Sequence, residues 1–397
     1  MFNIRMSKFR YGVNKNFLYA SATLIGTIVG AGMFGLPYVV ARSGFLIGAV
    51  FLLVLTGVTL LIHLIYGEIV CRTKEKHRLV GYAEHYLGKW GKRIATFSIL
   101  IGFYGSLLVY IIISGEFLAT IFSSFLGGSP FVYSLVFVAI GAFAVFKDMA
   151  LIKRMELGMS LFLILIVFLI FFSGLPHIDI SNFKNIDFKY FFLPYGVIFW
   201  ALAGGAAIPE IREILETDLP AGKAGGKKYK KTIILGTIIP AILYFLFMLT
   251  VVGISGQATS VEAIKGLIGF LGEGIIILGA ILGLLAVITS YFVIGLYLKK
   301  VFWYDYKINK TLSWFLVCFI PLIGFLLGLR EFIPIVGFLG VIFGAIEGTV
   351  LVLTYLKAKK SGDREPEYSL NIPSVIIYSL IVLFILGFIY QIIYFVK

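Results

Sequence analysis

The sequence predicts an all-α integral membrane protein with about eleven transmembrane helices. Sixty per cent of its 397 residues are hydrophobic, 14% are charged, and the mean hydropathy is +1.02. A soluble domain of this length could not cover so many apolar side chains, because much of its surface must be polar. The apolar residues also fall into long blocks rather than amphipathic stripes, which indicates helices that face lipid.

Eleven apolar blocks approach the length that a bilayer core requires, roughly 20 helical residues. They cover about 17–40, 44–70, 94–126, 131–146, 155–174, 190–209, 232–255, 274–298, 312–329, 332–356 and 373–396. The fourth block is the shortest. We expect one polytopic domain over 1–397, made of a first repeat at 17–174, a second at 190–356 and an extra helix at 373–396.

The basic residues predict the orientation of these spans in the membrane. The net charge is +14, but the charges lie between apolar blocks and not in one patch, so we predict no nucleic-acid partner. With the N-terminus in the cytoplasm, almost all of the 34 lysines and arginines fall on the inner side, as the positive-inside rule requires. The exceptions are Arg42, Lys184, Lys189, Lys265, Arg330 and Lys397. The C-terminus is then outside, and the N-terminal segment does not read as a cleaved signal peptide.

Two segments between spans predict short helices on the membrane surface. The segment at 79–90 should lie on the inner face, and a second at 261–271 on the outer face. The cysteines, Cys71 and Cys318, define neither a disulfide framework nor a zinc site.

The first span contains a glycine-rich interruption, with four glycines and a proline between Gly26 and Pro37. Glycine frees the backbone and proline removes a hydrogen-bond donor, so a continuous helix is not expected. Close packing against another helix is the alternative, since small residues at a spacing of four also permit that.

The sixth span repeats this pattern, with a small-residue cluster from Phe199 that ends at Pro209 and Glu210. The first and sixth spans hold the same position in each half of a five-plus-five repeat. Paired interruptions of this kind indicate the binding site of a transporter. Unwound backbone offers N–H groups to an anion and carbonyls to a cation, which suits an α-amino acid.

These elements resemble motifs of the amino acid–polyamine–organocation superfamily. The run from Gly26 to Pro37 resembles its first-helix motif, and GGAAIPE at 204–210 its sixth-helix motif. The runs at 230–244 and 288–291 are similar to its amino acid/auxin and aromatic amino acid permease branch. The resemblance implies a LeuT-type fold with a 5+5 inverted repeat plus one extra helix, helices 1 and 6 broken, and alternating access.

The resemblance also implies a substrate site at the two breaks. The N–H groups of Ala31 and Gly32 would hold the α-carboxylate, and the carbonyls of Ile28, Trp200 and Ala203 the α-ammonium. The adjoining Gly204 and, from span three, Tyr110 complete the expected site. Tyr110 and Trp200 could instead be packing residues.

A sodium site is predicted on span eight, where the Ala286 carbonyl and the hydroxyls of Thr289 and Ser290 share one helix face. With the carbonyls of Gly26 and Val29 they supply five oxygens, the ligands a hard cation prefers. Alternatively, the hydroxyls bond back to carbonyls one turn earlier. Proton-coupled relatives place a lysine there, which makes Lys153 the rival candidate. We expect no other cofactor.

Four acidic residues, Glu68, Glu116, Glu210 and Glu347, lie in or near spans. Structural ion pairs are the favoured interpretation for all four. Glu347 lies deepest within its span, and a role in proton relay is the alternative for it. His63 should form hydrogen bonds between helices. Spans one, three, six and eight carry no charged cluster, which favours a neutral substrate, and the resemblance favours an aromatic or large aliphatic one.

Together these features predict a secondary active transporter that imports a neutral amino acid with Na⁺ or H⁺. Its expected partners are the amino acid and the lipid bilayer of a prokaryotic plasma membrane, with no obligatory protein partner. A receptor of the same fold that binds an amino acid without transport is the main alternative. A channel would need a filter motif or a ring of like charges, and an enzyme clustered His, Cys or acidic residues.

Overall fold

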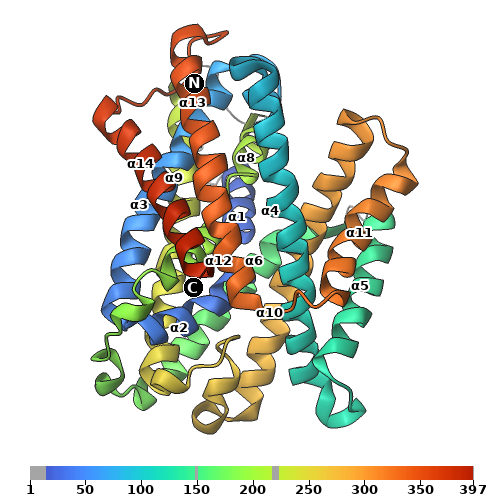
Figure 1. Cartoon of the computed structure of the whole chain (residues 1–397), viewed down its shortest axis with the longest axis vertical. Helices are drawn as coiled ribbons and strands as arrows, with labels where there is room; N and C mark the ends of the chain where they lie inside the picture. The colour runs from blue at the N-terminus through green and yellow to red at the C-terminus, as the bar shows by residue number, and fades with distance from the viewer. Residues whose placement is uncertain (1–14, 148–150, 217–222, 397) are drawn as a thin grey trace, which may run out of the picture.

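The computed structural model describes residues 15–147, 151–216 and 223–396, which form helices and no strand (Figure 1). The α-helices are α1 Lys15–Ile28, α2 Gly32–Ser43, α3 Phe45–Arg72, α4 Leu79–Leu126, α5 Pro130–Phe146, α6 Leu151–Gly174, α7 Leu193–Ala201, α8 Ala207–Glu216, α9 Lys223–Ser255, α10 Ile268–Lys300, α11 Lys310–Leu326, α12 Phe332–Ile342, α13 Thr349–Ser361 and α14 Ser374–Val396. Short helices connect them: η1 Leu175–His177, η2 Ile180–Phe183, η3 Phe188–Tyr190, η4 Gly256–Ala258, η5 Lys265–Leu267, η6 Val301–Asp305 and η7 Phe343–Gly348.

Each predicted span corresponds to one helix or to consecutive helices. Among the described residues, six helices are long and apolar enough to cross a membrane alone, and a seventh span arises if α1 and α2, bent by 49°, count together. The helices α5 and α11 have 17 residues each, roughly 25 Å at the α-helical rise, which is near the lower limit. The pair α7 and α8 forms the interrupted sixth span, and α12, η7 and α13 form the tenth.

Two glycines with positive φ separate surface helices from spans. The predicted inner helix is the start of α4, and Gly88 (φ 71°) turns the chain into the span. On the other side, helix begins only at Lys265, and Gly272 (φ 76°) marks the kink at the start of α10. The prediction of a helix from residue 261 was therefore wrong for its first four residues, which form turns.

The helices pack as two groups that are mixed in sequence. One group contains α1, α3, α8 and α9, and the other contains α4, α5, α10 and α11 (Figure 1). The breaks belong to the first group, while α4 and α10 of the second group face them. Any site at the breaks therefore lies between two bodies, each of which has its own internal contacts.

Segments assigned to the same side of the membrane meet at the same end of the molecule. At one end, Arg78 pairs with Glu213 at 2.8 Å, and Arg212 pairs with Glu367. At the other end, Lys265 pairs with Glu116 at 2.6 Å. These contacts agree with the predicted division of the loops. Which end is cytoplasmic stays a prediction.

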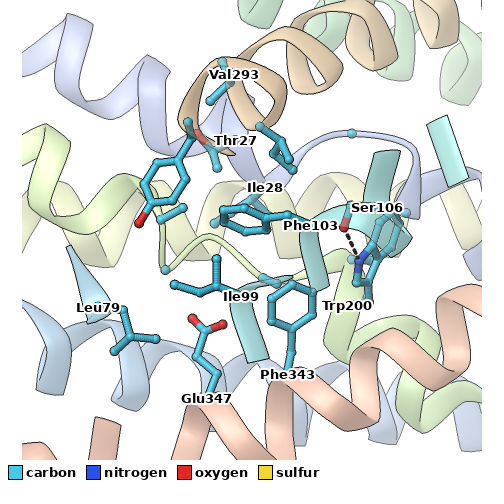
Figure 2. Close-up of a pocket in the computed structure, with 18 of the residues that line it drawn as sticks. Thr27, Ile28, Leu79, Ile99, Phe103, Ser106, Trp200, Val293, Phe343 and Glu347 are labelled. Carbon is cyan, nitrogen blue, oxygen red and sulfur yellow. Dashed lines mark hydrogen bonds between the residues drawn. The ribbon is translucent and has the colours of Figure 1, made fainter. Parts of the chain in front are cut away.

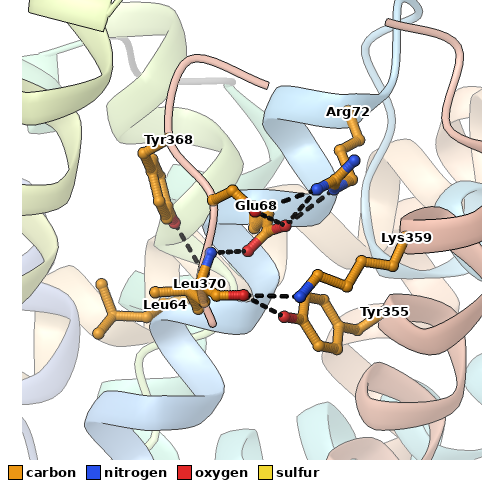
Figure 3. A network of polar contacts seen from close by, with 8 residues as sticks. Leu64, Glu68, Arg72, Tyr355, Lys359, Tyr368 and Leu370 are labelled. Atoms are coloured by element: carbon orange, nitrogen blue, oxygen red, sulfur yellow. Dashed lines mark hydrogen bonds and ion pairs between the residues drawn. The ribbon is translucent and has the colours of Figure 1, made fainter. Parts of the chain in front are cut away.

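The segment at 363–370, between α13 and α14, is held against α3 by a buried carboxylate (Figure 3). The backbone N–H of Leu370 donates to Glu68 Oε2 at 2.6 Å, and Arg72 Nε donates to Oε1 at 2.8 Å. Tyr368 donates to the Leu64 carbonyl at 2.7 Å, and Lys359 Nζ donates to the Leu370 carbonyl at 2.7 Å. We call residues 363–370 the clasp.

Candidate functional site

The first break separates α1 from α2 at residues 29–31. Helical bonding persists up to Val29, whose N–H donates to the Ile25 carbonyl at 2.7 Å, and resumes with Met33, which donates to Gly30 at 3.3 Å. Within the described chain, the N–H groups of Ala31 and Gly32 have no hydrogen-bond partner. They stand at the positive end of the α2 dipole, which favours an anion.

The second break separates α7 from α8 at residues 202–206, and His63 of α3 supports it. The Gly204 N–H donates to His63 Nε2 at 3.3 Å. His63 Nδ1 lies 2.9 Å from the Thr237 hydroxyl, which donates to the Ile233 carbonyl at 2.9 Å. Donors and acceptors match if the imidazole is neutral with its hydrogen on Nδ1. The interhelical role expected for His63 is thus observed.

Tyr244 of α9 connects the two breaks directly. Its hydroxyl lies 2.7 Å from the Ile28 carbonyl and 2.9 Å from the Ala201 carbonyl, the last residues of α1 and α7. This role of Tyr244 was not predicted from the sequence. Tyr244 ends the run at 230–244 that carried the resemblance, but nothing in that run distinguishes it from a packing tyrosine.

A cavity of about 870 Å³, part of it open to solvent, lies between the two helix groups at the breaks (Figure 2). Its walls come from the breaks, from α3, α4 and α10, and from η7. The lining residues are Thr27, Ile28, Gly30, Ala31, Gly32, Tyr66, Arg78, Leu79, Ile99, Phe103, Ser106, Tyr110, Trp200, Ala201, Ala203, Gly205, Ala206, Val293, Ile294, Tyr297, Phe343 and Glu347. The cavity extends to Arg78 and Leu79, at the start of α4.

Most residues predicted for the substrate site line this cavity. They are Ile28, Ala31, Gly32, Tyr110, Trp200 and Ala203. Gly204 does not line it, and a side chain at that position would meet Ile28 and Leu24 of α1. Trp200 forms part of the wall, with its Nε1 donating to the Ser106 hydroxyl at 3.3 Å and its ring centroid 6.2 Å from that of Tyr110. The substrate-binding roles of these residues stay predictions.

The hydroxyls proposed for sodium bond back along α10. Thr289 and Ser290 donate to the Ala286 carbonyl at 2.9 and 3.0 Å, which is the arrangement of the alternative interpretation. Ser290 nevertheless faces the first break, since a Cβ at Gly30 would lie 3.2 Å from its Oγ. The predicted ligands Gly26 and Val29 do not line the cavity. Lys153 is in the first turn of α6, and its side chain lies outside the described residues.

The acidic residues divide into two kinds. Glu68 pairs with Arg72 at 2.7 Å, and Glu116 pairs with Lys265, as expected for structural ion pairs. Glu347 differs, because its carboxylate points into the cavity and no described residue forms a hydrogen bond or ion pair with it. The ion-pair interpretation was therefore wrong for Glu347.

Three aromatic side chains that do not line the cavity pack together at the end of the molecule opposite Arg78. Phe34 of α2, Phe117 of α4 and Phe247 of α9 are buried. The centroid of the Phe34 ring lies 4.7 Å from that of Phe117 and 5.9 Å from that of Phe247. Phe117 adjoins Glu116, so this aromatic plug lies on the side of the Lys265 ion pair.

Solved structures with the same arrangement of helices belong to transporters. The nucleobase-cation-symport-1 family transporter Mhp1, in a closed conformation with bromovinylhydantoin bound, gives a TM-score of 0.67 at 11% identity over 95% of this chain and 89% of that chain. Its inward-facing conformation gives 0.69 at 12% identity over 96% and 91%. Mhp1 has the LeuT fold with a 5+5 inverted repeat, so the predicted fold class is confirmed.

Sequence relatives cover nearly the whole chain. Glutamine transporter 2 of Aliivibrio fischeri is 23% identical over 369 residues, which are 89% of this chain and 92% of the relative. Tyrosine-specific transport system 1 of Haemophilus influenzae is 27% identical over 373 residues, 86% and 88% of the two chains. These names indicate a multi-pass membrane transporter rather than an enzyme. The sequence profile of the tryptophan/tyrosine permease family matches residues 13–393, and the chain belongs to this family.

Proposed function

We propose that this protein is a secondary active transporter that imports a neutral amino acid by alternating access. The observation that carries the proposal is the pair of N–H groups of Ala31 and Gly32, which have no partner among the described residues and belong to the lining of a cavity between two separately packed helix groups. A carboxylate satisfies such donors at the N-terminus of a helix. The names of the relatives support a small-molecule substrate of the amino-acid class.

The polar end of the substrate would lie at the breaks and its side chain against apolar groups. The carbonyls of Ile28, Trp200 and Ala203 are the proposed acceptors for the α-ammonium, although Ile28 also accepts from Tyr244. Ile99, Phe103 and Phe343 line the adjacent wall. Aromatic and aliphatic walls gain free energy by covering an apolar or aromatic side chain. We therefore favour an aromatic or large aliphatic amino acid.

Alternating access would use the two helix groups as the moving parts. In this conformation the cavity reaches Arg78, and the packed rings of Phe34 and Phe117 are the groups that would close it on the other side. If the end with Arg78 faces the cytoplasm, as the positive-inside rule predicts, the conformation is an inward-facing one. Bacterial relatives fit a place in the plasma membrane of a prokaryote.

The coupling ion is Na⁺ or H⁺. A sodium ion would use Ala286, Thr289 and Ser290 with carbonyls of the first break, and would require the two hydroxyls to turn their lone pairs toward Gly30. Uptake in sodium against choline at fixed pH separates the two ions. The double change Thr289→Val with Ser290→Ala should abolish a sodium effect and leave proton-driven uptake intact, whereas equal wild-type rates in the two media exclude the sodium site.

Uptake by proteoliposomes that contain only this chain tests the function itself. A panel of twenty labelled amino acids should give counterflow for one or a few neutral members, and no partner protein should be required. Saturable binding without counterflow for any of them would instead favour a receptor of the same fold.

A further inference from the structure

Glu347 is an acidic group in the cavity that the proposed substrate contacts leave without a role. It lies in the π-helical segment η7, between α12 and α13, and its carboxylate points into the cavity (Figure 2). Ile99 and Phe343, which are drawn beside it, are apolar. An ionised carboxylate in such surroundings costs free energy unless a cation or hydrogen-bond donors meet it.

No cation of the described chain neutralises this carboxylate. The other titratable or charged groups that line the cavity are Tyr66 of α3, Arg78, Tyr110 of α4 and Tyr297 of α10. Arg78 already pairs with Glu213 of α8 at 2.8 Å. The described parts of α7, α12, α13 and α14, which pack near η7, add no charged side chain to the lining. Glu347 must therefore bind a proton or meet a group that enters the cavity.

The second break passes directly beside the carboxylate. A Cβ at Gly205 would lie 3.2 Å from Glu347 Oε1, a tighter contact than most Cβ atoms make, so the carboxylate lies close to the backbone of the break. The N–H groups of Gly205 and Ala206 have no hydrogen-bond partner in the described chain, and they precede the N-terminus of α8. An ionised Glu347 is attracted to these donors and to the helix dipole more strongly than a protonated one.

We propose that Glu347 carries the proton that drives the transport cycle. The carboxylate takes one proton from the aqueous phase when the cavity is open to the outside and becomes a neutral carboxyl group. It returns that proton to the inner phase when the cavity opens toward Arg78. Because η7 and the second break are separate elements of the cavity wall, the change of charge alters the attraction between them.

This inference rests on the proposed transport function and selects the proton over sodium as the coupling ion. The choice of the proton agrees with the hydroxyls of Thr289 and Ser290 in α10, which donate to the Ala286 carbonyl. A substrate hydrogen-bond donor that meets Glu347 is the competing explanation. The two differ in the sign of the pH dependence, because a proton carrier favours substrate binding when it is protonated, whereas a carboxylate that accepts from the substrate favours binding when it is ionised.

The test uses the full chain in proteoliposomes with labelled L-tyrosine, in sodium-free medium. Counterflow by the wild type establishes the transport function first, and its absence would count against that function and not against Glu347 alone. The wild type should then accumulate tyrosine when the outside is acidic. The Glu347→Gln variant should lose accumulation, and Glu347→Asp should restore part of it.

Binding at a series of pH values supplies a second measurement that does not require transport. If substrate prefers the protonated protein, the wild-type Kd should rise by up to about tenfold per pH unit at alkaline pH. The Glu347→Gln variant should remove this slope. Glu116→Gln, which alters an ion-paired glutamate away from the cavity, is the matched control and should keep it.

Three results would overturn the proposal. The first is proton-driven accumulation by Glu347→Gln equal to that of the wild type, and the second is a pH slope of Kd that the substitution leaves intact. The third is loss of tyrosine binding by Glu347→Gln at every pH while phenylalanine binding is kept, which would assign Glu347 to the phenolic hydroxyl.

Discussion

At the scale of single residues, the two chain breaks depend on how closely their backbones approach. Gly32 begins α2, and a Cβ there would lie 2.6 Å from the Cα of Ala201 at the end of α7. Because Gly32 has no side chain, the backbones of the two breaks can approach closely. A Cβ at this position would point at α7 rather than at the substrate.

We expect Gly32→Ala to destabilise the protein by about 1–3 kcal/mol, the usual cost of overpacking. The melting temperature of the purified protein in detergent should fall. Gly57→Ala is the control, because a Cβ at Gly57 of α3 meets nothing within 4 Å and alanine favours helix. Equal melting temperatures for the two variants would contradict the close approach.

Tyr244→Phe should remove the hydroxyl that connects the two breaks. Loss of the hydroxyl leaves the carbonyls of Ile28 and Ala201 without their donor, at a cost of about 1–3 kcal/mol. Binding of L-tyrosine should weaken several-fold, because both breaks contribute to the site. Tyr104→Phe is the control, since the Tyr104 hydroxyl has no partner among the described residues. A control that weakens binding equally would show that any buried tyrosine matters.

The two breaks could be predicted from the sequence, but the residues that support them could not. The glycines and the prolines at Pro37 and Pro209 are local signals, because they act on the backbone where they stand. Tyr244 and Glu347 act on segments far away in the sequence, so their roles depend on which helices face each other. One sequence holds no such information: it assigned no role to Tyr244, and it favoured an ion pair for Glu347.

At the scale of elements, hydropathy predicted the spans because lipid-facing helices are apolar over their whole length. It could not place the kinks at Gly88 and Gly272, where a helix continues past a residue with positive φ. It also gave no reason to expect order in the polar clasp. That order comes from Glu68, whose carboxylate is fully buried and accepts from Arg72 of α3 and from Ser369 and Leu370 of the clasp.

Removing this carboxylate should release the clasp. Glu68→Ala leaves the Arg72 guanidinium and the Leu370 N–H without their acceptor, and breaking a buried pair costs about 3–5 kcal/mol. Hydrogen exchange at residues 363–372 should increase and the melting temperature should fall. Glu84→Ala removes an exposed partner of Lys92 and should cost at most about 1 kcal/mol. Unchanged exchange in Glu68→Ala would mean that the clasp is held by Arg212 and Glu367 instead.

At the scale of the whole molecule, the proposed alternating access depends on how the helices are grouped around the cavity. The first group carries both breaks, and the second group carries the facing wall with Phe103, Tyr110 and Val293. A small rotation between the groups would separate Phe34 from Phe117 and bring Arg78 nearer the breaks. The sequence could not predict which conformation is populated, because both use the same apolar faces.

Accessibility of introduced cysteines tests both sidedness and conformation. In a background in which the buried Cys71 and Cys318 are replaced by alanine, Lys310→Cys should react with an impermeant maleimide only from the cytoplasm, and Asn185→Cys only from outside. Val293→Cys, in the half-buried wall of the cavity, should react from the same side as Lys310→Cys. These reactivities are compared in inside-out and right-side-out vesicles.

Opening the aromatic plug should then change the side from which the cavity is reached. Phe117→Ala removes the ring that packs on Phe34, so the free-energy difference between the two conformations should shift by a few kcal/mol, enough to populate the second one. Val293→Cys should become reactive from the Asn185 side as well, while its reaction from the Lys310 side slows. Reaction of Val293→Cys from the Asn185 side before the plug is altered would mean that the opening lies at the other end. Reaction from the Lys310 side alone in both proteins would mean that the plug is not what separates the cavity from the outside.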